Sequence, residues 1–80
     1  MEIFRFEPIA INERAPGGAR DLRTFDDIGA FILIHVDDAR RLAPHWVSVR
    51  RDLIQARFGA RQVEVHQAMR DALSREGWLG

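Results

Sequence analysis

The chain is organised around WVSVRRDLIQARF, residues 46–58, which Gly59 follows. The apolar residues of this stretch recur at helical spacing, and Pro44 before it suits the first turn of a helix. We therefore predict a helix over residues 44–58, with Gly59 just beyond its end because glycine readily adopts the conformation found there. Its narrow core stripe is Trp46, Val49, Leu53 and Ala56.

A second apolar strip runs along another side of the same predicted helix. A small domain needs one buried face from such a helix, and this one has two. Either the rest of the monomer covers the second face, or another chain does. We predict a homodimer in which this strip meets its own copy or meets exposed apolar residues of an earlier helix. The residues predicted for self-association are Val47, Ile54, Phe58, Leu33 and Ile34.

A β-hairpin is predicted over about residues 3–24. Residues 3–11 alternate like a strand, and the parity of their apolar positions changes at Pro8, which indicates a bulge. The segment APGGA, residues 15–19, is a turn signal, since glycine supplies positive φ. Residues 20–23 then return as a short second strand. Such a hairpin needs helices on one face to be stable.

Two further helices are predicted, over residues 25–36 and 62–76. Thr24 suits the N-cap of the first, and acids follow in its first turn. The composition of residues 30–36 also fits a buried strand, but the cap favours a helix. Residues 37–43 form a charged connection, Gly77 ends the last helix, and Trp78-Leu79 folds back as a plug. The prediction is one α+β domain, residues 1–80, with a two-stranded antiparallel β-hairpin packed on three helices.

Length and composition limit the classes of function. A chain of 80 residues buries about 60–65% of its unfolded surface, so it gains much from a partner. There is no cysteine, which excludes disulfides and thiolate chemistry. The apolar run at residues 29–34 is too short to span a bilayer, and the N-terminal residues do not look like a signal peptide. We expect a small soluble protein of the cytoplasm with no membrane partner.

Four segments of the chain form a recognisable pattern of core and cap positions. They are Glu7-Pro8-Ile9-Ala10-Ile11, Asp27-Ile28 with Phe31-Ile32-Leu33, Trp46 with Val49, Leu53, Ala56 and Gly59, and Ala72-Leu73 with Gly77-Trp78-Leu79. Together they resemble a family of short bacterial proteins that is catalogued only as a domain of unknown function, and the resemblance covers nearly the whole chain. It implies a β-β-α-α-α fold and carries over no catalytic residue. The family pattern would place a tryptophan near Val36 and a smaller residue at Leu53, so this chain departs from it there.

The charges are unevenly distributed although the formal net charge is zero. Residues 1–38 hold eight acids and four arginines, and residues 39–63 hold six arginines and one acid. This basic band can attract a nucleic acid or an acidic protein partner, or the acidic flanks can neutralise it within the molecule. Arginine binds phosphate in a bidentate way and stacks on bases. The candidate nucleic-acid contacts are Arg40, Arg41, Arg50, Arg51, Arg57 and Arg61.

Two groups of residues invite a catalytic or metal-binding interpretation. His35 with Asp37 and Asp38 contains ligand types for a divalent metal, but His35 shares a side with buried residues and suits a structural role. His45, Ser48 and Asp52 follow one another at helical spacing, which is far more typical of a solvated helix face than of a triad. We predict no catalytic residue, no metal and no cofactor.

The sequence therefore favours a small non-enzymatic interaction module that self-associates. The alternative is a nucleic-acid-binding regulator that uses the arginine band of residues 40–61. These two functions differ in the surface they need, because the first requires exposed apolar residues and the second requires free arginines.

Overall fold

The computed structural model describes residues 5–56 and 62–80, apart from the side chains of residues 5 and 6. The predicted α+β class is confirmed. The positions expected at residues 57–59, including the last turn of the central helix and its glycine stop, lie outside the described residues. The described elements are β1 (Arg5–Ile11), β2 (Arg20–Thr24), α1 (Phe25–His35), α2 (Asp38–Arg41), α3 (Pro44–Ala56) and α4 (Gln62–Glu76).

The hairpin forms as predicted. Strands β1 and β2 pair antiparallel with Ile9 opposite Leu22, and the register is irregular between Arg5 and Ile9, around Pro8. Gly17 and Gly18 in the turn have φ values of +84° and +83°, a region that favours glycine. Because side chains alternate across a strand, Ile9 and Leu22 both reach the buried face.

Residues 25–35 are helical, which decides between the helix and strand alternatives. The Thr24 side chain accepts a hydrogen bond from the Asp27 backbone N–H at 3.1 Å, and the Asp27 carboxylate accepts one from the Thr24 N–H at 3.1 Å. This is a capping box, and it satisfies amides that the first helical turn leaves unpaired. Asp27 also accepts a hydrogen bond from the Arg23 N–H at 2.8 Å, which ties β2 to the start of α1.

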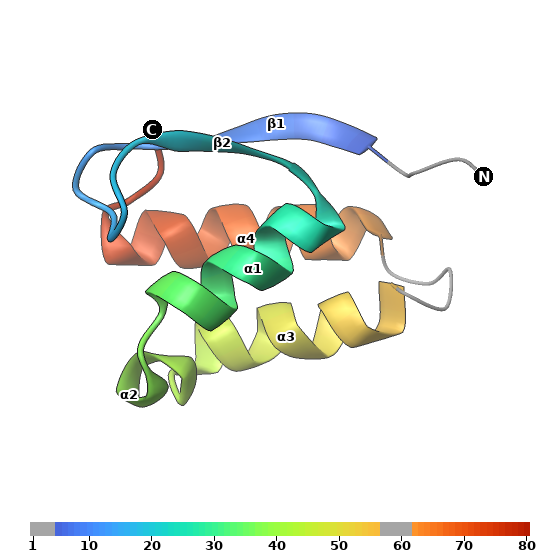
Figure 1. The fold of residues 1–80 in the computed structure, drawn as a ribbon. Coiled ribbons are helices and arrows are strands. Elements are labelled where there is room, and N and C mark those ends of the chain that lie inside the picture. Colours follow the sequence, from blue (N-terminus) through green and yellow to red (C-terminus); the bar gives the residue numbers. More distant parts are fainter. Residues whose placement is uncertain (1–4, 57–61) are drawn as a thin grey trace.

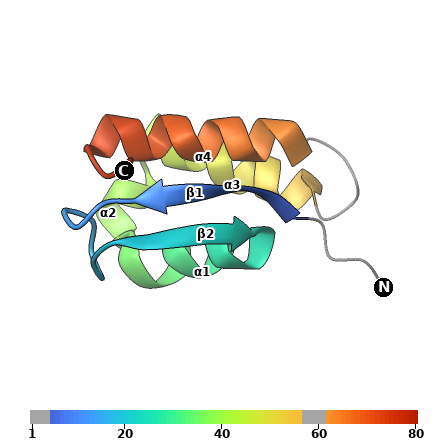
Figure 2. The same ribbon diagram turned by 90° about the horizontal axis from the view of Figure 1, so that it is seen from above.

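The molecule has the hairpin on one side and α3 on the other. Figure 1 shows α1 and α4 between them, and in Figure 2, seen from the hairpin side, β1 runs alongside α4 while β2 runs over α1. The hairpin therefore cannot cover the second strip of α3. Val47 is 46% exposed and Ile54 is 60% exposed, whereas Trp46 and Val49 on the core stripe are fully buried.

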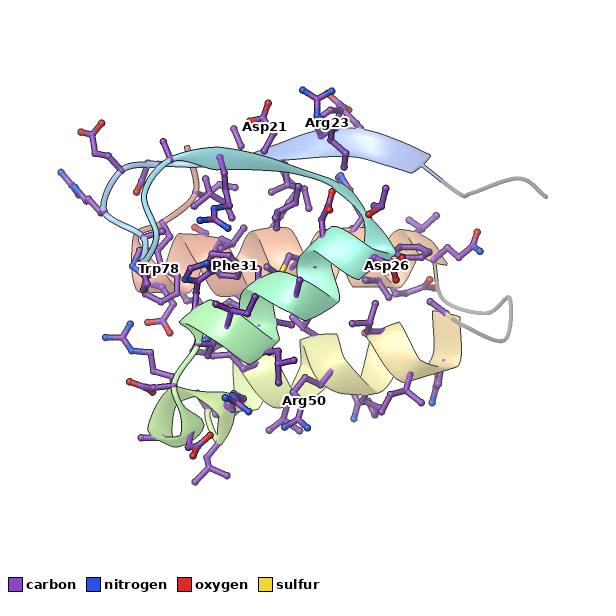
Figure 3. The ribbon with its side chains drawn as sticks, in the orientation of Figure 1. Asp21, Arg23, Asp26, Phe31, Arg50 and Trp78 are labelled. Atoms are coloured by element: carbon purple, nitrogen blue, oxygen red, sulfur yellow. The ribbon has the colours of Figure 1, made fainter. Side chains whose placement is uncertain are left out.

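An aromatic cluster closes the core at the end where the chain returns. The ring of Trp78 lies 6.1 Å from that of Phe31 and 6.2 Å from that of Trp46. Gly77 turns the chain after α4 with φ +80°, and Leu79 forms a bridge with Ile11 of β1. The predicted C-terminal plug is thus confirmed, with Trp78 only 5% exposed. Figure 3 shows Trp78 and Phe31 close together.

The one-turn helix α2 was not predicted. Asp37 caps it by accepting a hydrogen bond from the Arg40 N–H at 2.8 Å, and α2 buries no residue. Without a buried stripe it leaves no periodic signal in the sequence. Among the described residues, no helix combines the length and the apolar character that crossing a bilayer requires.

Candidate interaction surface

A groove of about 410 Å³ lies between α1 and α3, on a part of the molecule that the hairpin does not cover. Leu33 of α1 and Ile54 of α3 line it and are 69% and 60% exposed. The sequence predicted both residues for self-association from two separate helices, and the structure brings them to one groove. The complete lining is Asp26, Gly29, Ala30, Ile32, Leu33, Arg41, Arg50, Leu53 and Ile54.

The other residues predicted for self-association lie elsewhere. Ile34 is 69% exposed but borders a separate hollow beside β2, together with Leu22 and Phe31. Val47 is half-exposed on α3 and does not line the groove between α1 and α3. Phe58 lies outside the described residues. Of the four described residues in this set, only Leu33 and Ile54 line this groove.

Two of the predicted nucleic-acid contacts, Arg40 and Arg41, lie next to groups of the protein itself. The Arg40 guanidinium lies 5.0 Å from the Trp78 ring centroid and 3.8 Å from the Glu76 carboxylate. Arg41 donates to the Val36 carbonyl at 2.8 Å and lies 3.1 Å from the Asp38 carboxylate. Such contacts partly neutralise these cations within the molecule.

The remaining arginines of the band differ in their surroundings. The exposed Arg51 guanidinium lies 3.8 Å from the buried Asp52 carboxylate, a long ion pair. Arg57 and Arg61 lie outside the described residues. Within the described part of the chain, Arg50 has neither a hydrogen bond nor an ion pair through its guanidinium, and it faces the groove. The tryptophan within the band, Trp46, is fully buried and offers no face on which a base could stack.

Glu76 of α4 contacts two residues of α3, and the sequence did not indicate these contacts. Its carboxylate accepts a hydrogen bond from the Trp46 indole N–H at 2.8 Å, and the same oxygen lies 3.5 Å from His45 Nε2. The carboxylate therefore joins the end of α4 to the start of α3. A buried indole N–H needs such an acceptor, so the arrangement is explained by the stability of the core.

The residues weighed for a triad do not assemble as one. His45 and Ser48 border a shallow hollow with Asp71 and Arg75, which pair with each other at 2.8 Å. Asp52 is buried and does not line that hollow.

The residues weighed for a metal site also serve separate roles. The His35 ring lies 5.4 Å from that of Phe31, Asp37 caps α2, and Asp38 lies beside Arg41. In residues 5–56 and 62–80, no three histidine or carboxylate side chains group as metal ligands do.

Comparisons of this chain with protein-family models, with curated proteins and with solved structures found no match. The resemblance to a domain family of unknown function therefore stays a prediction.

Proposed function

We propose that this protein is a small, non-enzymatic interaction module that self-associates through the groove between α1 and α3. The observation that carries the proposal is the exposure of Leu33 and Ile54 in one groove. Burying such side chains against a second copy removes apolar surface from water, which drives most protein association. A chain of this size gains stability from doing so.

The polar contacts around the hollow beside His45 support a module without catalysis. Asp71 and Arg75 line that hollow and are paired with each other, and the Glu76 carboxylate, which does not line it, accepts the hydrogen bond of the Trp46 indole. We propose the cytoplasm as the compartment, because a protein without cysteine needs no oxidising environment. The family resemblance, if the chain belongs to that family, adds no activity to this proposal.

Sedimentation equilibrium over a concentration series tests self-association. We expect the parent protein to form dimers at micromolar concentration, and Ile54→Glu to shift it to monomers because an unpaired charge would be buried in the interface. Val63→Glu is the matched control: Val63 is 65% exposed on α4 and does not line the groove. A parent protein that stays monomeric at high concentration would refute the proposal, and equal effects of the two variants would place the interface elsewhere.

A further inference from the structure

The groove between α1 and α3 contains two charged groups of opposite sign that make no ion pair or hydrogen bond with the described residues. Asp26 lies in the first turn of α1 and Arg50 lies midway along α3, and both line the groove. Figure 3 shows the two residues on their separate helices. Within the described residues neither side chain makes an ion pair or a hydrogen bond, unlike Arg41, the third charged residue of the lining.

The two charges lie on opposite sides of the place where the helices touch. Gly29 of α1 approaches Leu53 of α3 so closely that a Cβ added to the glycine would lie 3.6 Å from Leu53 Cδ2. Asp26 precedes Gly29 by three residues, and Arg50 precedes Leu53 by three. Three residues correspond to about 4.5 Å along a helix. Because α1 and α3 run in opposite directions (Figure 1), Asp26 and Arg50 are displaced by that distance to opposite sides of the contact between Gly29 and Leu53.

This placement is self-complementary. In a two-fold dimer the two copies use the same surface patch. If one residue of the first copy contacts another residue of the second copy, the same two residues also meet with the copies exchanged. A two-fold axis that lies in the interface and bisects the line from Asp26 to Arg50 brings each carboxylate opposite the guanidinium of the other copy. The small residues Gly29 and Ala30 beside that line leave room for an apolar side chain of the other copy.

We propose that the partner of this groove is a second copy of the chain, in a two-fold arrangement in which Asp26 of each copy pairs with Arg50 of the other. The inference rests on the proposed function and specifies its register. Leu33 and Ile54 supply the affinity, and the two reciprocal ion pairs fix the orientation, since such pairs contribute more to specificity than to binding strength.

Charge reversal tests this arrangement. Asp26→Arg alone places like charges opposite each other twice in the dimer, and so does Arg50→Asp alone. We expect each variant to raise the dimer dissociation constant about tenfold or more. An equimolar mixture of the two variants restores opposite charges at both pairs, so heterodimers should form with the parent affinity. The double variant in one chain should likewise recover homodimers.

The outcomes separate this inference from the proposed function. Monomeric parent protein overturns both. If Ile54→Glu abolishes the dimer but the charge reversals leave its dissociation constant unchanged, the groove is the interface and the register is wrong. Failure of the mixture and of the double variant to recover affinity also overturns the register. Recovery in the double variant excludes misfolding as the cause of the single-variant losses, and circular dichroism of each variant checks this directly.

Discussion

Among single residues, Glu76 links the end of α4 to the core through its carboxylate. It accepts the hydrogen bond of a fully buried indole, and it lies 3.8 Å from the Arg40 guanidinium that covers Trp78. We expect Glu76→Gln to lower the free energy of unfolding by about 1–2 kcal/mol, because a hydrogen bond to a charged group becomes one to a neutral amide. Urea denaturation followed by tryptophan fluorescence measures the change.

Asp71→Asn is the matched control for that variant. Asp71 also loses a charge and a 2.8 Å contact, in this case with Arg75, but both side chains are more than half exposed. Exposed pairs contribute little, so the control should change stability by less than about 0.5 kcal/mol. Equal losses in the two variants would show that the indole contact does not matter.

Burial could be predicted for single residues, whereas their partners could not. The helical spacing of Trp46 with Leu53 predicted that both are buried, and they are. The acceptor for the Trp46 indole lies 30 residues further along the chain. No local pattern encodes such a pair, because it depends on how the end of α4 is oriented against the start of α3.

For the helices α4 and α1, replacing Gly77 and replacing Gly29 with alanine should change the stability in opposite directions. Gly77 ends α4 with φ +80° and has open space around it, so Gly77→Ala should cost about 1 kcal/mol of stability through its backbone alone. Gly29 lies inside α1, where an added Cβ would make an ordinary contact, so Gly29→Ala should gain about 0.5–1 kcal/mol. Thermal unfolding at concentrations below dimer formation measures both. A stabilised Gly77→Ala would contradict the end of α4 described above.

Element boundaries followed from local chemistry. The cap at Thr24 and the turn glycines Gly17 and Gly18 act within a few residues, so the sequence revealed them. The groove did not follow from such signals. Leu33 and Ile54 were recognisable as surplus apolar residues. The packing of α1 against α3 decides that these two share a groove and that Ile34 and Val47 do not line it. The charge of Asp26 gave no hint of its place there.

Over the molecule as a whole, the arginine band is the candidate surface for binding nucleic acid. Arg40 and Arg41 are held by groups of the protein, and the net charge is zero. We expect no measurable binding of a fluorescent DNA or RNA mixture at about 0.15 M salt. The electrostatic part of the affinity for nucleic acid depends on free cationic side chains that displace counterions from the phosphates. Fluorescence anisotropy at low and high salt decides it. Salt-sensitive binding that Arg50→Ala weakens would support the alternative function.

The contacts at the two edges of the hairpin have a consequence for how the protein behaves in a crowded solution. The Arg23 amide is taken by the Asp27 carboxylate, and on the opposite strand residues 78–80 bond to Ala10 and Asn12. A free strand edge is a template on which another chain can pair and start an aggregate. Here part of each edge is already bonded, through the Arg23 N–H beside β2 and through the Ala10 carbonyl and the Asn12 N–H beside β1. These contacts reduce the length of edge that is open to another chain, and they lie on the hairpin, away from the groove between α1 and α3 where we propose that copies meet.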